Sequence, residues 1–209
     1  MPSEIRYHPL ERRQLAAVVD LQSALHVAFA GIESRRLYHA ICRDALREGG
    51  RAVCLVCEID GIAAGFVVAF VHATAYWKEF CVRRPALALR ILASRLWRKR
   101  DHTGAAGTAA SPVPALVDPG PAPASWAEST DRIAKIQFIG VAPLFRGRGI
   151  ASELYRRLAI HLGARGLTRI DARIATDNIA SIKLHHNAGW KLYLDSDGIF
   201  AIYPLTRPD

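Results

Sequence analysis

The chain has 209 residues and a formal net charge of +9, with 51% hydrophobic and 22% charged residues. This balance excludes a disordered chain, and the length predicts one domain with a sizeable core. The polar start lacks the apolar stretch of a signal peptide, and the longest apolar run, residues 62–71, is half of the roughly 20 residues that span a membrane. We therefore expect a soluble, cytoplasmic protein.

The positive charge is concentrated in two segments. Residues 75–101 hold eight basic and two acidic residues, and residues 143–169 hold six basic residues and one glutamate. The remainder of the chain is slightly acidic. Two local patches, with no recognisable nucleic-acid-binding motif, do not favour a generally basic nucleic-acid surface. We expect no nucleic-acid partner.

The first half of the chain predicts a strand, two helices and a hairpin. Residues 4–8 favour a short strand, and apolar residues at helical spacing predict helices over about 10–29 and 34–48. Two β-rich runs follow, joined by Asp60-Gly61. This dipeptide is typical of a type I′ hairpin turn, which needs positive φ at both positions.

Cys54-x-x-Cys57 resembles half of a zinc site, but no second pair of ligands follows it. The two cysteines lie in a predicted strand, where their odd spacing places the side chains on opposite faces. We therefore expect buried free thiols and no metal.

The middle of the chain has a different composition. Residues 76–100 form a basic amphipathic pattern, in which Pro85 opens the regular part of a helix. Of the 31 residues in 101–131, 22 are Ala, Pro, Gly, Ser or Thr, which predicts a flexible loop. We interpret 76–131 as an insertion in a single domain that spans 1–209. The basic helix also suits contact with an anionic membrane, and the alternative is a helix that buries its leucines on the domain.

An ordered pattern returns at Ile133 and predicts the second half of the fold. A strand is followed by a glycine-rich turn, a long helix, another strand, a short helix and two terminal strands. The predicted elements are a strand at 133–141, a helix to about Gly166, a strand at 168–174, a helix at 178–187 capped by Gly189, and strands around Asp197-Gly198.

The glycine-rich turn carries the clearest chemical signal. Residues 146–151, Arg-Gly-Arg-Gly-Ile-Ala, place small residues where the backbone bends and exposes its amides. The helix that begins there offers unpaired N–H groups and a positive dipole end, which together bind phosphate. No Gly-Lys-Ser/Thr follows, and the third glycine of the dinucleotide fingerprint is absent.

This turn resembles the acyl-CoA-binding motif of the GCN5-related N-acetyltransferases (GNAT), Gln/Arg-x-x-Gly-x-Gly/Ala. Residues 178–190 resemble the second signature of that family, Asn-x-x-Ala/Ser-x-x-Leu-Tyr-x-x-x-Gly-Phe. The resemblance covers about 1–75 and 131–205. It implies a single α/β domain with a mixed, mostly antiparallel twisted sheet, flanked by helices and splayed where the acyl chain enters.

The resemblance also implies acetyl-CoA as the cosubstrate of an N-acetyltransferase, without a metal. The pyrophosphate would lie on the backbone amides of Arg146, Gly147, Arg148, Gly149, Ile150 and Ala151. The pantetheine arm would pair with Ile139, Gly140 and Val141, and Asn178 would bond to the pantetheine or support the thiol.

One position departs from the family pattern. Where many members have a tyrosine that protonates the leaving thiolate, this chain has His185. An imidazole can donate a proton near neutral pH, so the resemblance implies a catalytic His185. The alternative is a helix-surface histidine without a catalytic role. The general base stays open between Glu58, His72, Gln137 and a chain of waters.

The acceptor also stays open. The resemblance implies direct attack by a primary amine in a ternary complex, and the basic segment 76–100 favours an anionic small molecule such as an amino sugar or nucleotide sugar. A protein N-terminal or lysine acetyltransferase is an alternative. A non-catalytic module that binds CoA or a membrane is another. The length of the acyl group and the oligomeric state are not predicted.

Overall fold

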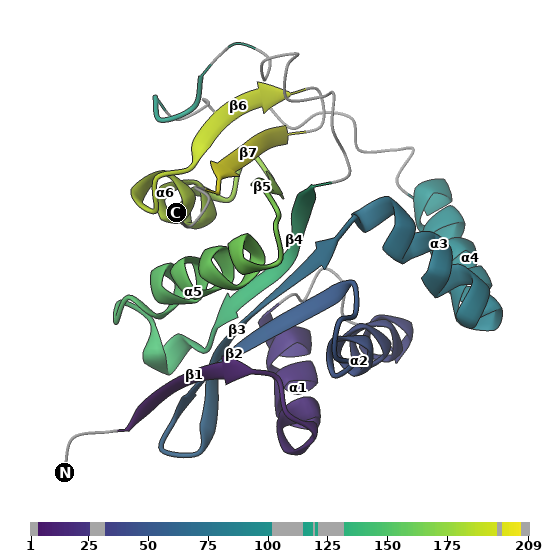
Figure 1. The fold of residues 1–209 in the computed structure, drawn as a ribbon. Coiled ribbons are helices and arrows are strands. Elements are labelled where there is room, and N and C mark those ends of the chain that lie inside the picture. Colours follow the sequence, from purple (N-terminus) through teal and green to yellow (C-terminus); the bar gives the residue numbers. More distant parts are fainter. Residues whose placement is uncertain are drawn as a thin grey trace.

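A seven-stranded sheet, in the order β1-β2-β3-β4-β5-β7-β6, forms the centre of the described chain (Figure 1). The computed structural model describes residues 4–25, 32–101, 115–118, 120, 132–195 and 198–205. Neighbouring strands are antiparallel except for β4 and β5, which are parallel, so the predicted mixed, mostly antiparallel sheet is confirmed. The strands are β1 (Ile5–Pro9), β2 (Ala52–Ile59), β3 (Ile62–Val71), β4 (Ile133–Val141), β5 (Arg169–Ile174), β6 (Lys191–Asp195) and β7 (Gly198–Pro204).

Helices cover both faces of this sheet. In Figure 1, α1 and α2 lie on one side of the central strands and α5 lies on the other. The α-helices are α1 (Leu15–Leu25), α2 (Ile32–Ala45), α3 (Ala73–Arg83), α4 (Pro85–Asp101), α5 (Ile150–Ala164) and α6 (Ile179–Asn187), with 3-10 turns at Arg12–Gln14 and Pro143–Phe145. The helix predicted over 34–48 thus begins two residues earlier and ends three earlier. The helix predicted over 10–29 is a 3-10 turn followed by α1, and its end lies outside the described residues.

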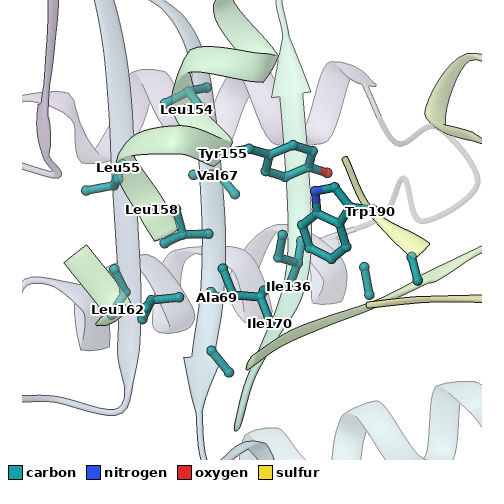
Figure 2. Packing of buried hydrophobic residues seen from close by; sticks show 14 of the residues in the cluster. Leu55, Val67, Ala69, Ile136, Leu154, Tyr155, Leu158, Leu162, Ile170 and Trp190 are labelled. Carbon is teal, nitrogen blue, oxygen red and sulfur yellow. The ribbon is translucent and has the colours of Figure 1, made fainter. Parts of the chain in front are cut away.

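The hairpin of β2 and β3 is buried on both faces, which explains its nearly continuous apolar sequence. Cys54 packs in the core cluster beneath α1 and α2, whereas Cys57 belongs to the cluster beneath α5. Figure 2 shows that second cluster, with Leu154 and Leu158 of α5 over the strands. The prediction of opposite faces is confirmed. Asp60 and Gly61 have φ of 49° and 82°, as a type I′ turn requires.

The sheet separates between β4 and β5. These strands pair only through Ile133–Lys135 and Arg169–Asp171, and in the described chain the rest of β4, Ile136–Val141, has no strand partner on that edge. The pairing with β3 shifts by one residue, because Val68 is opposite Phe138 and Ala69 is opposite Ile136. Gln137 is therefore the extra residue of a β-bulge, a feature that bends a strand. The predicted splay is present.

The basic segment 76–100 forms parts of two helices rather than one. The break falls at Arg84, with φ −140° and ψ 60°, because a residue before proline is disfavoured in the helical conformation. Pro85 then begins α4, as predicted. In the part of the chain that the structure describes, no helix is long and apolar enough to cross a bilayer.

The helix α3 is anchored to the domain by aromatic and ionic contacts. Tyr76 and Phe80 are each 1% exposed, and the Tyr76 ring stacks on Phe70 with centroids 4.0 Å apart. The Arg84 guanidinium donates two hydrogen bonds, of 2.7 and 2.8 Å, to the Asp44 carboxylate on α2. Phe80 is therefore part of the core. Contact of the basic segment with an anionic membrane stays a prediction.

Most of the predicted flexible loop, 101–131, lies outside the described residues. Residues 115–118 are an exception, because they lie beside β6. The Asp118 N–H donates to the Leu192 carbonyl and the Leu194 N–H donates to the Asp118 carbonyl, each at 2.9 Å. Val117 is 6% exposed and belongs to the core cluster under α5. This part of the insertion therefore packs on the domain rather than forming a free loop.

Candidate functional site

The glycine-rich turn brings β4 to the start of α5 through two left-handed residues. Gly147 and Gly149 have φ of 77° and 74°, values that residues with a side chain rarely adopt. Gly149 is the N-cap of α5 and offers no side chain to the first turn. The first amides of this 15-residue helix therefore have no partner within the helix, and the positive dipole end meets an open space.

That space is a cavity of about 660 Å³ between the diverging parts of the sheet, here called the splay cavity. Nine of the predicted site residues line it, which is all of them except Arg148 and His185: Ile139, Gly140, Val141, Arg146, Gly147, Gly149, Ile150, Ala151 and Asn178. The lining residues that were not predicted are Leu25, Phe145, Ser152, Ala180, Ser181 and Leu184. Ser181 and Leu184 belong to the second signature, which was the available signal for them.

One wall of the splay cavity is the free edge of β4. A Cβ on Gly140 would lie 2.5 Å from Cδ1 of Leu25 and 3.0 Å from Cε1 of Phe66, so a larger residue there would have to displace these side chains. The Arg146 Nε donates to the Val141 carbonyl at 3.2 Å and closes the end of this edge. An unpaired strand edge can accept an extended chain through backbone hydrogen bonds.

The charge beside the turn is positive. Arg146 and Arg148 are exposed, and the Arg148 guanidinium lies 5.6 Å from the Phe145 ring centroid. Glu153, in the first turn of α5, bonds instead to Arg156 and Arg157 at 2.7 and 2.6 Å. These hydrogen bonds, that of Arg156 first, lower the Glu153 pKa to about 2. Its charge is thus balanced by α5 itself.

Asn178 lines the splay cavity and is the N-cap of α6. Its side-chain oxygen accepts a hydrogen bond from the Ser181 N–H at 3.1 Å. This bond fixes the orientation of the amide and leaves its two N–H donors for a ligand in the splay cavity.

His185 lies behind the cavity wall rather than in it. The side chain is 2% exposed and packs between Tyr155 and Trp190, which Figure 2 shows side by side. Its Nδ1 lies 2.7 Å from the Ser181 carbonyl and its Nε2 lies 2.9 Å from the Tyr155 hydroxyl. Because a carbonyl only accepts, Nδ1 carries the proton and Nε2 accepts from Tyr155.

Both ring nitrogens of His185 are therefore engaged, Nδ1 within α6 and Nε2 with Tyr155 of α5. Burial lowers the His185 pKa to about 4, so the ring is neutral near pH 7. The ring does not line the splay cavity, and the catalytic role implied for His185 stays a prediction. Ser181 links His185 to the splay cavity, because its hydroxyl lies 3.3 Å from the His185 Nδ1 and Ser181 itself lines the cavity.

The three candidate bases lie elsewhere. Glu58 is 5% exposed, hydrogen-bonded to Gln14 and 3.2 Å from Arg13. His72 is the N-cap of α3 at the far end of β3 and lines a separate hollow. Gln137 lines a groove with α3 and α4. None of them lines the splay cavity, and within the described ranges no group of three or more His, Cys, Asp or Glu could hold a metal ion.

The model of the Acetyltransferase (GNAT) family matches residues 16–190. Among solved structures, the ribosomal-protein-S18-alanine N-acetyltransferase from Escherichia coli is 16% identical, with a TM-score of 0.57 over 99% of this chain and 97% of that one. The aminoglycoside N-acetyltransferase AAC(6')-Iy in complex with CoA is 16% identical, with a TM-score of 0.55 over 90% and 89%. The PaiA N-acetyltransferase from Thermoplasma acidophilum in complex with coenzyme A is 10% identical, with a TM-score of 0.60 over 96% and 99%. At these identities the likeness to solved structures shows the fold.

Proposed function

The chain belongs to the GNAT family of acetyltransferases and is an acyltransferase that uses acetyl-CoA, and we propose that it acetylates the primary amine of a small molecule. The observation that carries this proposal is the splay cavity, which joins the start of α5 to the free edge of β4. An elongated ligand with an anionic end and an amide-containing arm matches these two features in the same order.

The residues present fit coenzyme A along the whole cavity. The unpaired amides after Gly149 would hold the pyrophosphate, with Arg146 and Arg148 adding positive charge. The edge at Ile139–Val141 would pair with the amides of the pantetheine arm, and the Asn178 amide would donate to it from the opposite wall.

Acetyl-CoA supplies an activated acetyl group as a thioester. The chain would hold it so that the amine nitrogen attacks the carbonyl carbon directly, a C–N bond forms and the C–S bond breaks. The amine loses one proton and the leaving sulfur gains one, so no other reactant is needed. Ser181 lines the cavity, and its hydroxyl would donate a hydrogen bond to the sulfur, with His185 behind it as a positioning residue.

Calorimetric titration with CoA tests the proposal. We expect saturable binding that Arg146→Glu weakens at least tenfold, since the substitution reverses charge beside the pyrophosphate site. Arg12→Glu is the matched control, because it changes the net charge equally on an exposed turn outside the cavity. Absence of CoA binding, or equal weakening by both variants, would contradict the proposal.

The acceptor class is tested by thiol release from acetyl-CoA with a panel of amines. The panel holds an amino sugar, a nucleotide-linked amino sugar, simple alkyl and aryl amines, and peptides with a free N-terminus or lysine. We expect turnover with a small amine. Turnover with peptides alone would replace this proposal with protein acetylation.

A further inference from the structure

A second hollow of about 660 Å³ lies between the two inserted helices, α2 and β4, and is here called the insertion groove. Its walls are mainly apolar side chains, including Leu37, Trp77, Phe80, Leu89 and Leu92, and Gln137 contributes a polar amide. No charged side chain lines it among the described residues. The volume is within the usual range of small-molecule sites, roughly 300–1,000 Å³.

The insertion groove and the splay cavity share strand β4. Gln137 lines the groove, and Ile139, Gly140 and Val141 line the cavity. Gln137 and Gly140 are three positions apart along the strand, or about 10 Å. The bulge in the β3–β4 pairing lies at Gln137, so β4 is bent where it passes from the insertion groove to the splay cavity. A molecule in the groove would meet the end of a chain laid along Ile139–Val141.

We propose that the insertion groove binds the apolar part of the acceptor, which is an aryl or aliphatic primary amine. This inference rests on the proposed function. The amine nitrogen would lie at Gln137, whose side-chain oxygen accepts a hydrogen bond from it. The nitrogen forms a bond to the acetyl carbon, the C–S bond breaks, and the proton lost by the amine balances the proton gained by the CoA thiol.

The exposed leucines of α4 support a ligand rather than a structural core. Leu89 and Leu92 are 66% and 55% exposed although both line the groove. Exposed apolar side chains gathered around a hollow are typical of binding sites. Apolar walls also disfavour the charged ammonium form, so they favour the neutral amine that attack requires. This would reduce the need for a strong general base.

Two arginines of the insertion, Arg83 and Arg84, face Asp44 rather than this groove. Arg84 is held by Asp44 through two hydrogen bonds, and Arg83 lies 3.7 Å from the same carboxylate. Neither arginine lines the groove. The amino-sugar and nucleotide-sugar acceptors suggested by the basic composition have no charged partner among the groove-lining residues.

The test uses the full chain and 2-phenylethylamine as the probe, with glucosamine 6-phosphate as the polar comparison. Calorimetry of the amine alone and thiol release with acetyl-CoA are measured for the wild type and for the double variant Leu89→Gln/Leu92→Gln. Val82→Gln is the matched control, because Val82 is an 82% exposed aliphatic residue on α3 outside the groove lining. Calorimetry of CoA and the melting temperature report on the rest of the domain.

We expect the double variant to raise the KM and Kd for 2-phenylethylamine at least tenfold, with the CoA Kd and melting temperature unchanged and Val82→Gln like the wild type. Unchanged phenylethylamine binding in the double variant, or preference for glucosamine 6-phosphate, would overturn the inference while leaving the proposed function intact. If the wild type does not bind CoA, the proposed function itself is overturned. A change of oligomeric state in the double variant would assign the groove to a second copy of this chain and also overturn the inference.

Discussion

The splay cavity and the insertion groove have the same volume, about 660 Å³ each, but different parts of the chain form their walls. The cavity is built largely from backbone: a strand edge, two left-handed glycines and a helix start. The groove is built from apolar side chains on helices that the family motifs do not include. In our proposals, backbone geometry binds the acetyl-CoA and the inserted side chains bind an acceptor particular to this chain.

A substitution at Asp44 removes the ionic contact that holds the insertion on α2, and we expect it to have the largest effect on stability. Asp44 is 3% exposed, and its pKa is lowered because Arg84 and Arg83 outweigh the effect of burial. Asp44→Ala should cost about 4 kcal/mol of unfolding free energy, since it leaves Arg84 without its buried partner. Urea unfolding measures this. The control is Asp20→Ala, which removes an exposed ion pair with Arg35 and should cost about 0.5 kcal/mol. Equal costs would show that Asp44 does not anchor the insertion.

A substitution at Gly149 tests whether the splay cavity depends on the backbone conformation of the turn. Gly149→Val places a β-branched residue at φ 74° and should weaken CoA binding by roughly 100-fold, because the first amides of α5 move. Gly166→Val carries the same strain at the other end of α5, with φ 76°, and should leave CoA binding unchanged. Calorimetric titration of both variants with CoA measures this difference. If both variants lose CoA binding equally, the effect comes from general destabilisation of the helix.

The wall behind the cavity can be weakened at His185. His185→Ala removes a buried ring with two hydrogen bonds and should cost about 3 kcal/mol of unfolding free energy. His186→Ala, at the exposed neighbouring position, should cost less than about 0.5 kcal/mol. A stable His185→Ala protein with no turnover would restore the direct catalytic role that the sequence resemblance implied.

The burial of His185 also makes the stability of the protein depend on pH. The His185 pKa is lowered to about 4 by burial, below its ordinary value of 6.5, so the unfolded chain binds more protons between these values. Stability is therefore full above pH 6.5 and falls as the pH is lowered toward 4. The loss attributable to His185 between pH 7 and 5 should be about 2 kcal/mol. Urea unfolding at both pH values should show a smaller difference in His185→Gln, and an identical difference would contradict a buried neutral ring.

Much of the fold and the backbone geometry of the glycine-rich turn could be predicted from the sequence, because local rules govern them. Positive φ at Asp60 and Gly61 follows from turn chemistry, and residues 146–151 follow from the needs of a helix start. The burial of His185 could not be predicted from its signature position, since its orientation depends on Tyr155 and Trp190 from other segments. The burial of Phe80 could not be predicted for a similar reason, since it depends on tertiary packing with Tyr76 and Trp77.

The docking of residues 115–118 has a consequence for how copies of this protein meet one another. The sheet ends at β6, and an uncovered outer strand is a template for pairing with another chain. Asp118 occupies backbone groups of Leu192 and Leu194 on that border and places a carboxylate there. At the opposite border β1 ends in Pro9, which has no N–H to donate. Asp118 thus covers part of the β6 border and Pro9 removes one donor from the β1 border, and both features disfavour pairing with another chain.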